Sequence, residues 1–168
     1  MDVLVIRHAI AEERETFALT GKSDELRPLT AEGRKRMARA AAGLRLVVPR
    51  IDVIATSPLV RAVQTAEVVA AAYGGVQPIE IDELRPESDS VRLARWLGEQ
   101  KNDSTIALVG HEPSLSFHVC WLTARSDDAF VEFKKGGTCM LRFYQGQYSG
   151  GATLLWMMTP KQLRRLGG

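Results

Sequence analysis

The chain has 168 residues, of which 45% are hydrophobic and 25% are charged, and its formal net charge is +2 at pH 7. These values are ordinary for a globular protein and fit a single domain over residues 1–168. A charge this close to balance gives no reason to expect a nucleic acid as partner.

The first predicted element is a strand that ends in two residues suited to chemistry. Residues 2–6 form a run of mostly branched apolar side chains, typical of a strand buried on both faces of a parallel sheet. Arg7 and His8 follow at its carboxyl end, where open α/β sheets bind ligands. A solvated strand end is the alternative for this pair. The run is too short to cross a bilayer and has no secretory signal pattern, so we expect a cytoplasmic protein without a membrane anchor.

A polar segment and an amphipathic helix come next. Residues 12–27 show no clear hydrophobic period and are predicted to be a loop. Thr30 is expected to cap a helix that runs to about Leu46, with apolar residues at helical spacing on one side. Residues 34–39 give the other side a basic character. We expect this face to be solvated, with a docking surface for an acidic partner as the alternative.

The second strand, over residues 51–56, leads directly into a helix. Ser57 is predicted to cap that helix, which runs to Tyr73 and closes at two glycines. Arg61 then lies near the first turn, where the helix dipole disfavours a cation by a few tenths of a kcal/mol. An anion held between Arg61 and the helix terminus would explain this choice, and a surface arginine is the alternative.

Strands and helices continue to alternate along most of the remaining chain. The predicted elements are a short strand over 79–81, a helix over 90–100, a strand over 105–109, a helix over 113–122, two strands over 138–144 and 152–158, and a short helix that begins at Thr159-Pro160. The last two strands are expected to form a hairpin through a turn at 145–151. This order predicts a three-layer α/β fold, with a mostly parallel central sheet, helices on both faces and an antiparallel C-terminal hairpin.

The two cysteines give no sign of a metal site. Cys120 and Cys139 have neither a CxxC spacing nor a neighbouring Cys/His cluster. We expect both to be packed, reduced thiols, which fits a reducing compartment.

The carboxyl ends of the predicted parallel strands gather several polar residues at one edge of the sheet. These residues are Arg7, His8, Ser57, Arg61, Glu83 and His111. Two guanidinium groups, two imidazoles and two helix N-termini describe a pocket for a dianionic tetrahedral group. The sequence has neither an acidic cluster for magnesium nor a GxxxxGK phosphate loop. We therefore expect phosphate chemistry without a metal or cofactor, using fixed cations and a histidine nucleophile.

At these residues the sequence resembles the histidine phosphatase superfamily, which has the phosphoglycerate mutase-like fold. The resemblance lies in the order and spacing of Arg7-His8, residues 57–65, Glu83 and Gly110-His111. Residues 27–33, with the sequence RPLTAEG, and the small size resemble the SixA branch of bacterial phosphohistidine phosphatases.

The resemblance implies a role for each of these residues. His8 would be the nucleophile and would form a phosphohistidine, while Arg7, Arg61 and His111 would bind the phosphoryl oxygens. We group Ser57 with the substrate-binding residues. Glu83 is matched to the acid that protonates the leaving group, with a structural role as the alternative. The sequence departs from the usual Arg-His-Gly tripeptide because Ala9 stands at the third position.

The chain has little beyond the core fold, so no long lid is available to enclose a small metabolite. We therefore expect a phosphatase that removes phosphate from phosphohistidine on a partner protein, such as a phosphorelay domain. A phosphatase of a small phosphorylated metabolite is the alternative. A non-catalytic phosphate-binding or docking module is the second alternative, although it would have no need of a nucleophile.

Overall fold

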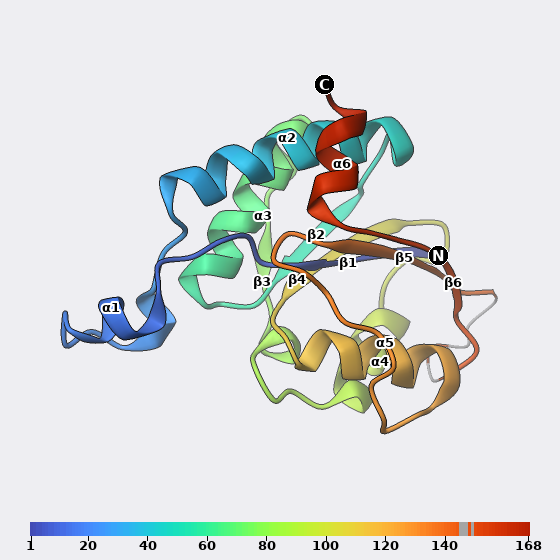
Figure 1. Ribbon diagram of the computed structural model, residues 1–168. Helices are drawn as coiled ribbons and strands as arrows, with labels where there is room; N and C mark the ends of the chain where they lie inside the picture. Colours follow the sequence, from blue (N-terminus) through green and yellow to red (C-terminus); the bar gives the residue numbers. More distant parts are fainter. Residues whose placement is uncertain (145–147, 149) are drawn as a thin grey trace.

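The computed structural model describes residues 1–144, 148 and 150–168 and shows a central sheet between two layers of helices (Figure 1). The strands in this part of the chain are β1 (Asp2–Arg7), β2 (Val53–Thr56), β3 (Ile79–Glu80), β4 (Thr105–Gly110), β5 (Thr138–Arg142) and β6 (Thr153–Met158). The helices are α1 (Arg14–Ala18), α2 (Ala31–Val47), α3 (Val60–Ala72), α4 (Ser90–Gly98), α5 (Ser114–Ala124) and α6 (Pro160–Leu166), with two 3-10 turns, η1 (Asp24–Leu26) and η2 (Asp82–Leu84).

The sheet combines a parallel part with an antiparallel edge. Its strand order is β3-β2-β4-β1-β5-β6. The pairs β1–β4, β2–β4 and β2–β3 are parallel, whereas β5 runs antiparallel to both β1 and β6. The predicted α/β architecture with an antiparallel C-terminal pair is therefore confirmed. The predicted turn over 145–151 includes residues 145–147 and 149, which lie outside the described part of the chain.

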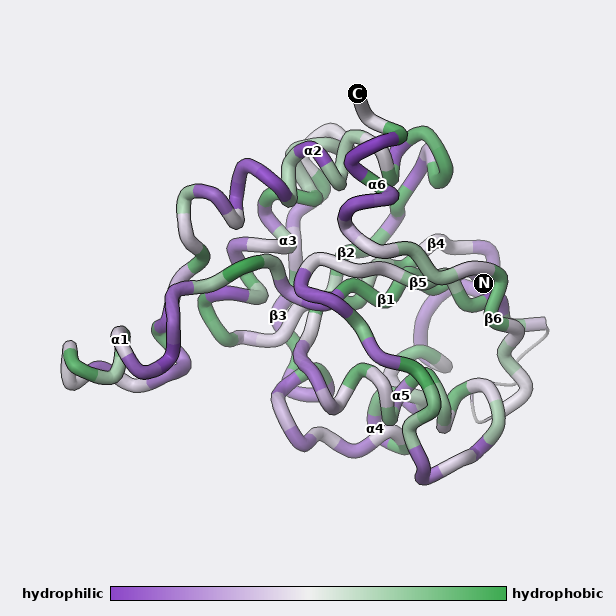
Figure 2. The backbone as a smooth tube through the Cα atoms, viewed as in Figure 1, coloured by the Kyte–Doolittle hydropathy of each residue, from purple (hydrophilic) through white to green (hydrophobic). Residues whose placement is uncertain are grey.

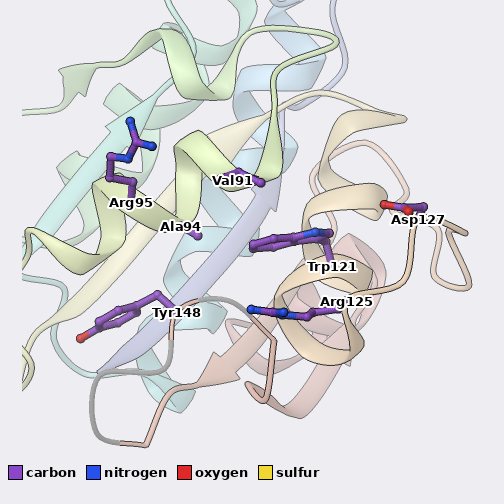
Figure 3. Close-up of a pocket in the computed structure, with 7 residues that line it drawn as sticks. All are labelled: Val91, Ala94, Arg95, Trp121, Arg125, Asp127 and Tyr148. Atoms are coloured by element: carbon purple, nitrogen blue, oxygen red, sulfur yellow. The ribbon is translucent and has the colours of Figure 1, made fainter.

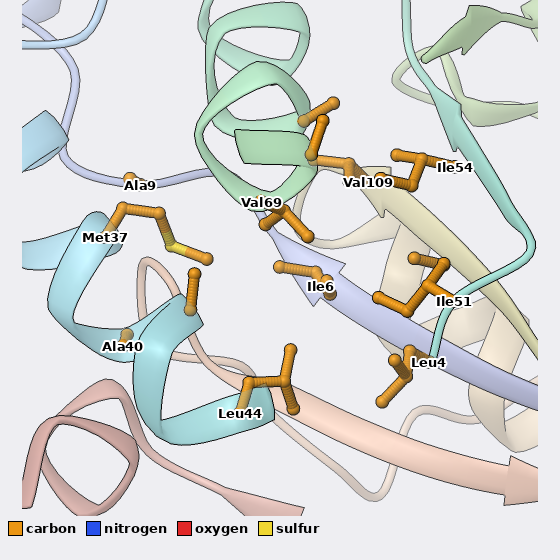
Figure 4. Packing of buried hydrophobic residues seen from close by; sticks show 14 of the residues in the cluster. Leu4, Ile6, Ala9, Met37, Ala40, Leu44, Ile51, Ile54, Val69 and Val109 are labelled. Carbon is orange, nitrogen blue, oxygen red and sulfur yellow. The ribbon is translucent and has the colours of Figure 1, made fainter. Parts of the chain in front are cut away.

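Strand β1 contributes to two separate cores because its side chains alternate between the faces of the sheet. Leu4 and Ile6 pack with α2, α3 and α6 on one side (Figure 4). Val3 and Val5 pack with α4 and α5 on the other side. None of these four side chains is more than 1% exposed. Figure 2 shows the same concentration of hydrophobic residues in the middle of the sheet. The prediction of a strand buried on both faces is confirmed.

The helix boundaries follow the predicted caps in two places and depart from them in one. The Thr30 hydroxyl accepts a hydrogen bond of 2.9 Å from the Gly33 amide and begins α2. Gly74 has a φ of 78° and ends α3 in the left-handed region. Helix α3, however, begins at Val60 rather than at Ser57. The prediction of Ser57 as the cap was wrong because this buried hydroxyl pairs with His111.

The segment over residues 12–27 is more ordered than a loop. It contains the one-and-a-half-turn helix α1 and the 3-10 turn η1. Phe17 is the only buried residue of α1, so the sequence carries no repeating hydrophobic pattern there. The turn η1 is held by Arg61, which is distant in the chain and binds both the carbonyl and the carboxylate of Asp24. Such long-range contacts are invisible to a local pattern.

The two cysteines are packed as predicted. Cys120 and Cys139 are both free and buried. No helix in the described residues has the length and apolar character needed to cross a membrane.

We predict that Gly43→Ala destabilises the protein although alanine is the better helix former. In α2 a methyl group at this position would overlap the carbonyl oxygen of Leu163 in α6. Separating the two helices should cost about 2 kcal/mol, which exceeds the gain of about 1 kcal/mol in helix propensity. Thermal unfolding measures the net change. The matched control is Gly98→Ala, where the nearest atom, in Tyr148, lies 3.5 Å away and no loss is expected. Equal stability of the two variants would contradict the prediction.

Candidate active site

The pairing of β1 with β4 brings two histidines together. In this parallel pair Arg7 lies opposite Gly110, so His8 and His111 each follow directly at the same edge of the sheet. The His8 amide donates a hydrogen bond of 3.0 Å to the Gly110 carbonyl. The two imidazole rings have centroids 5.1 Å apart. The expected convergence of these residues is therefore present in the structure.

A backbone contact orients the ring of His8. Its Nδ1 lies 2.8 Å from the carbonyl oxygen of Ala9, which can only accept a hydrogen bond. We assign the ring proton to Nδ1 on this basis, which leaves the lone pair on Nε2. The amide of Ala9 donates to the Thr65 hydroxyl, which donates in turn to the carbonyl of Arg61. His8 is thereby fixed to the first turns of α3.

Ser57 sets the proton position on His111. The Ser57 hydroxyl lies 2.8 Å from Nε2 of His111 and also accepts a weak contact of 3.4 Å from the Leu59 amide. We assign the hydroxyl proton to the contact with His111 on this basis. Nε2 then accepts, and Nδ1 carries the ring proton. This Nδ1 is buried without a hydrogen-bond partner, so it is a donor with unmet capacity.

Arg7 and Arg61 supply further donors. The Nη1 atom of Arg7 donates to the carbonyl of Phe133, and Nη1 of Arg61 donates to the carbonyl of Asp24 at 2.9 Å. In the described residues, the buried side-chain N and O atoms without a partner are Nε of Arg7, Nε of Arg61, Nδ1 of His111 and Oγ1 of Thr138. The first three belong to the predicted site. Unmet N–H donors of this kind favour an anion as ligand.

Both imidazoles are held neutral. Burial, together with the positive charges of Arg61, Arg7 and Arg27, lowers the pKa of His8 to about 3 against the opposing effect of the Ala9 carbonyl. Burial also lowers the pKa of His111 to about 2, with His8 and Arg61 adding to the effect. A neutral ring with a free nitrogen is the nucleophilic form of histidine.

Asp24 and Arg27 belong to the surroundings of the site, although the sequence analysis placed neither there. Nε of Arg27, a residue only 7% exposed, donates to Oδ1 of Asp24 at 2.7 Å. Nη1 of Arg61 lies 3.2 Å from Oδ2 of the same carboxylate. These contacts, led by the hydrogen bond from Arg27, keep the pKa of Asp24 below its usual value. Arg27 begins the RPLTAEG segment, but no local signal pointed to Asp24.

Glu83 is not brought to the two imidazoles. Its carboxylate lies 3.0 Å from Nη2 of Arg92 in α4 and lines a small surface pocket with residues of that helix. The predicted position after β3 is correct, and the contact that the structure shows for the carboxylate is the one with Arg92. This contact supports the structural alternative for Glu83. Its role as the proton donor stays a prediction.

The third histidine lies outside the site. His118 is buried in α5, where Nδ1 and Nε2 lie 2.8 and 3.1 Å from the hydroxyls of Ser90 and Ser88. Burial lowers its pKa to about 4. These bonds tie α5 to the segment that leads into α4.

The site is also distinct from a cavity of about 600 Å³ between α4 and α5 (Figure 3). Trp121 and Arg125 line this cavity from the C-terminal end of α5, whereas His111 precedes the N-terminal end of the helix. The described residues contain no cluster of three or more His, Cys, Asp or Glu side chains that could hold a metal ion.

Comparisons with known proteins agree with this geometry. The family model of the histidine phosphatase superfamily (branch 1) matches residues 3–90. An uncharacterised protein of Picosynechococcus sp. is 34% identical over 84% of this chain and 85% of its own length. Phosphohistidine phosphatase SixA of Escherichia coli K12 is 26% identical over 98% of this chain and 97% of its own length. The solved structure of protein histidine phosphatase SixA complexed with tungstate superposes with a TM-score of 0.81, at 26% identity, over 97% of this chain and 99% of that one.

We predict that none of the three histidines titrates with a midpoint above pH 5 in the folded protein. The structure lowers the pKa of each one, to about 3 for His8, 2 for His111 and 4 for His118. A pH titration of the ring nitrogens by NMR measures this directly. A midpoint near 6.5 for His8 or His111 would contradict the neutral pair described above.

The lowered pKa values of the histidines also determine how the free energy of unfolding changes with pH. The unfolded chain binds protons at histidine near pH 6.5, whereas the folded chain does so only at lower pH. The histidine contribution therefore lowers the free energy of unfolding as the pH falls from 7 to 5. Denaturant unfolding at the two pH values tests the direction, with His118→Gln reporting the share of the histidine outside the site.

Proposed function

Because this chain belongs to the histidine phosphatase superfamily and is a phosphatase, we propose that it hydrolyses phosphohistidine on a partner protein through an intermediate on His8. The observation that carries the proposal is the state of His8. Its ring is neutral, oriented through Nδ1 and placed 5.1 Å from His111, beside donors with unmet capacity.

The first chemical step follows from this arrangement. Nε2 of His8 attacks phosphorus in line with the bond to the leaving atom, a new N–P bond forms, and the leaving atom departs with the electron pair of the broken bond. The donors of Arg7, Arg61 and His111 bind the phosphoryl oxygens as negative charge develops on them. In the second step a water oxygen attacks phosphorus, the N–P bond to His8 breaks, and inorganic phosphate leaves.

In the part of the chain that the structure describes, the lack of an acidic side chain in contact with the two imidazoles favours phosphohistidine as substrate. In the described residues, the hydrogen-bond partners of the two imidazoles are Ala9 for His8 and Ser57 for His111, and neither is an acid. Asp24 is held ionised by Arg27 and Arg61, so it has no proton to give at neutral pH. A phosphohistidine ring that carries a proton on its other nitrogen leaves as a neutral imidazole, whose conjugate acid has a pKa near 6.5, so the site need supply no further proton. An alkoxide leaving group from a phosphomonoester needs far more help.

The likeness to SixA supports the same substrate class. SixA of E. coli carries the name phosphohistidine phosphatase, and this chain matches almost its whole length. A small phosphorylated metabolite is the competing substrate, and it would need an acid that Glu83 does not supply in its present contact with Arg92.

We predict that a phosphodonor labels the protein with a phosphoryl group that is labile in acid and stable in base. His8→Ala should remove the label and lower turnover by at least about 1,000-fold, because the nucleophile is lost. Intact-mass spectrometry and turnover of para-nitrophenyl phosphate check both effects. The matched control is His118→Gln, another buried histidine replaced, which should keep the label. Label that persists in His8→Ala would end this mechanism, and absence of turnover in the unaltered chain would favour a binding module.

A direct comparison of substrates tests the partner. We expect kcat/KM for a phosphorylated phosphorelay domain to exceed that for each member of a panel of phosphorylated metabolites by at least about 100-fold. The expectation rests on the leaving group, so phosphoramidate should also be cleaved with a higher kcat/KM than an alkyl phosphate, whose alkoxide needs an acid. The opposite order would assign the chain to small phosphomonoesters.

A further inference from the structure

The guanidinium group of Arg7 is anchored by one peptide carbonyl. Its Nη1 donates to the carbonyl oxygen of Phe133, a residue with no exposed surface. Phe133 comes from the segment between α5 and β5, which also contacts the backbone of the site. The Gly136 amide donates to the carbonyls of Arg7 and His8 at 3.1 Å each. The position of this segment therefore decides where the remaining donors of Arg7 point.

A carboxylate holds the segment in place. Oε1 of Glu112 accepts a hydrogen bond of 2.6 Å from the Phe133 amide. The hydroxyl of Ser116, one turn further along α5, donates to the same carboxylate at 2.7 and 2.8 Å. Ser116 is only 3% exposed and Glu112 is half-buried, so these bonds are partly shielded from water. A hydrogen bond to an ionised acceptor is about twice as strong as one between neutral groups.

Glu112 therefore spans two parts of the phosphate site. It follows His111 directly in the chain, and through Phe133 it meets the anchor of Arg7. One residue thus couples the loop after β4, which carries one phosphate donor, to the end of β1, which carries another. The proposed reaction places no atom of Glu112 on the substrate, and its side chain is already engaged by two donors.

We propose that Glu112 is a positioning residue that sets the guanidinium of Arg7 for the phosphoryl group by fixing the carbonyl of Phe133. The inference rests on the proposed phosphate role of Arg7. Glu112 acts only through that arginine, so its effect on anion binding vanishes when the guanidinium is absent. A carboxylate that simply stabilised the fold would act equally with and without Arg7.

The test is a double-mutant cycle read by calorimetric binding of tungstate to the full chain, which needs no turnover. Glu112→Ala should weaken tungstate binding about tenfold, the equivalent of one lost hydrogen bond to an ionised group. Glu112→Gln keeps an oxygen that accepts from the Phe133 amide and should stay within about twofold of the unaltered chain. In an Arg7→Ala background, Glu112→Ala should cause no further loss. The matched control is Glu132→Ala, which removes an exposed carboxylate of the same segment that pairs with Lys134 and should leave tungstate binding normal.

The outcomes separate this inference from the proposed function. An equal loss from Glu112→Ala in both backgrounds, or no loss in either, overturns the positioning role. If Arg7→Ala itself leaves tungstate binding unchanged, the phosphate role of Arg7 fails instead. Should Glu112→Ala not fold, as judged by thermal unfolding, Ser116→Ala removes one support of the carboxylate. It should weaken binding about threefold only when Arg7 is present, and unchanged binding there counts against the inference.

Discussion

The register of the β1–β4 pair is the constraint on which the site depends. Arg7 faces Gly110 across the two parallel strands, and the two histidines emerge one residue later, at the same edge of the sheet. A shift of one residue would turn every side chain of β1 to the opposite face and separate the rings. Burial on both faces protects this register, because each of Val3, Leu4 and Val5 would leave its own core. The chemistry of His8 thus rests on the packing of residues that never meet the substrate.

The parts of the molecule that could be predicted are those whose signal is local. Strand β1 is predicted by its continuous run of apolar residues. Helix α2 is predicted by the cap at Thr30 and by apolar residues at helical spacing. His8 and His111 were found because they end such strands. Helix α1 was missed because a single buried side chain gives no period. Asp24 and the orientation of Glu83 were also missed, since each is decided by an arginine far away in the chain or on another helix.

The site combines neutral histidines with charged arginines, which accommodate burial in different ways. Burial is tolerated by His8 and His111 because they give up their protons, whereas the arginines keep theirs and find oxygen partners instead. The result is a pair of neutral imidazoles beside fixed positive charge. That combination is unfavourable for a cation and favourable for a dianion, and a dianion is the ligand that a phosphatase must recognise.

The ion pair between Asp24 and Arg61 affects how tightly an anion could bind to Arg61. Under the proposed role of Arg61, a dianion that takes its Nη1 displaces the Asp24 carboxylate, so its affinity would be the difference between two attachments to one cation. The contact between Asp24 and Arg61 also holds η1, so anion binding at Arg61 and the ordering of η1 would be thermodynamically linked. A change that stabilises η1 in this position would weaken anion binding, and anion binding would destabilise the position of η1 by the same free energy.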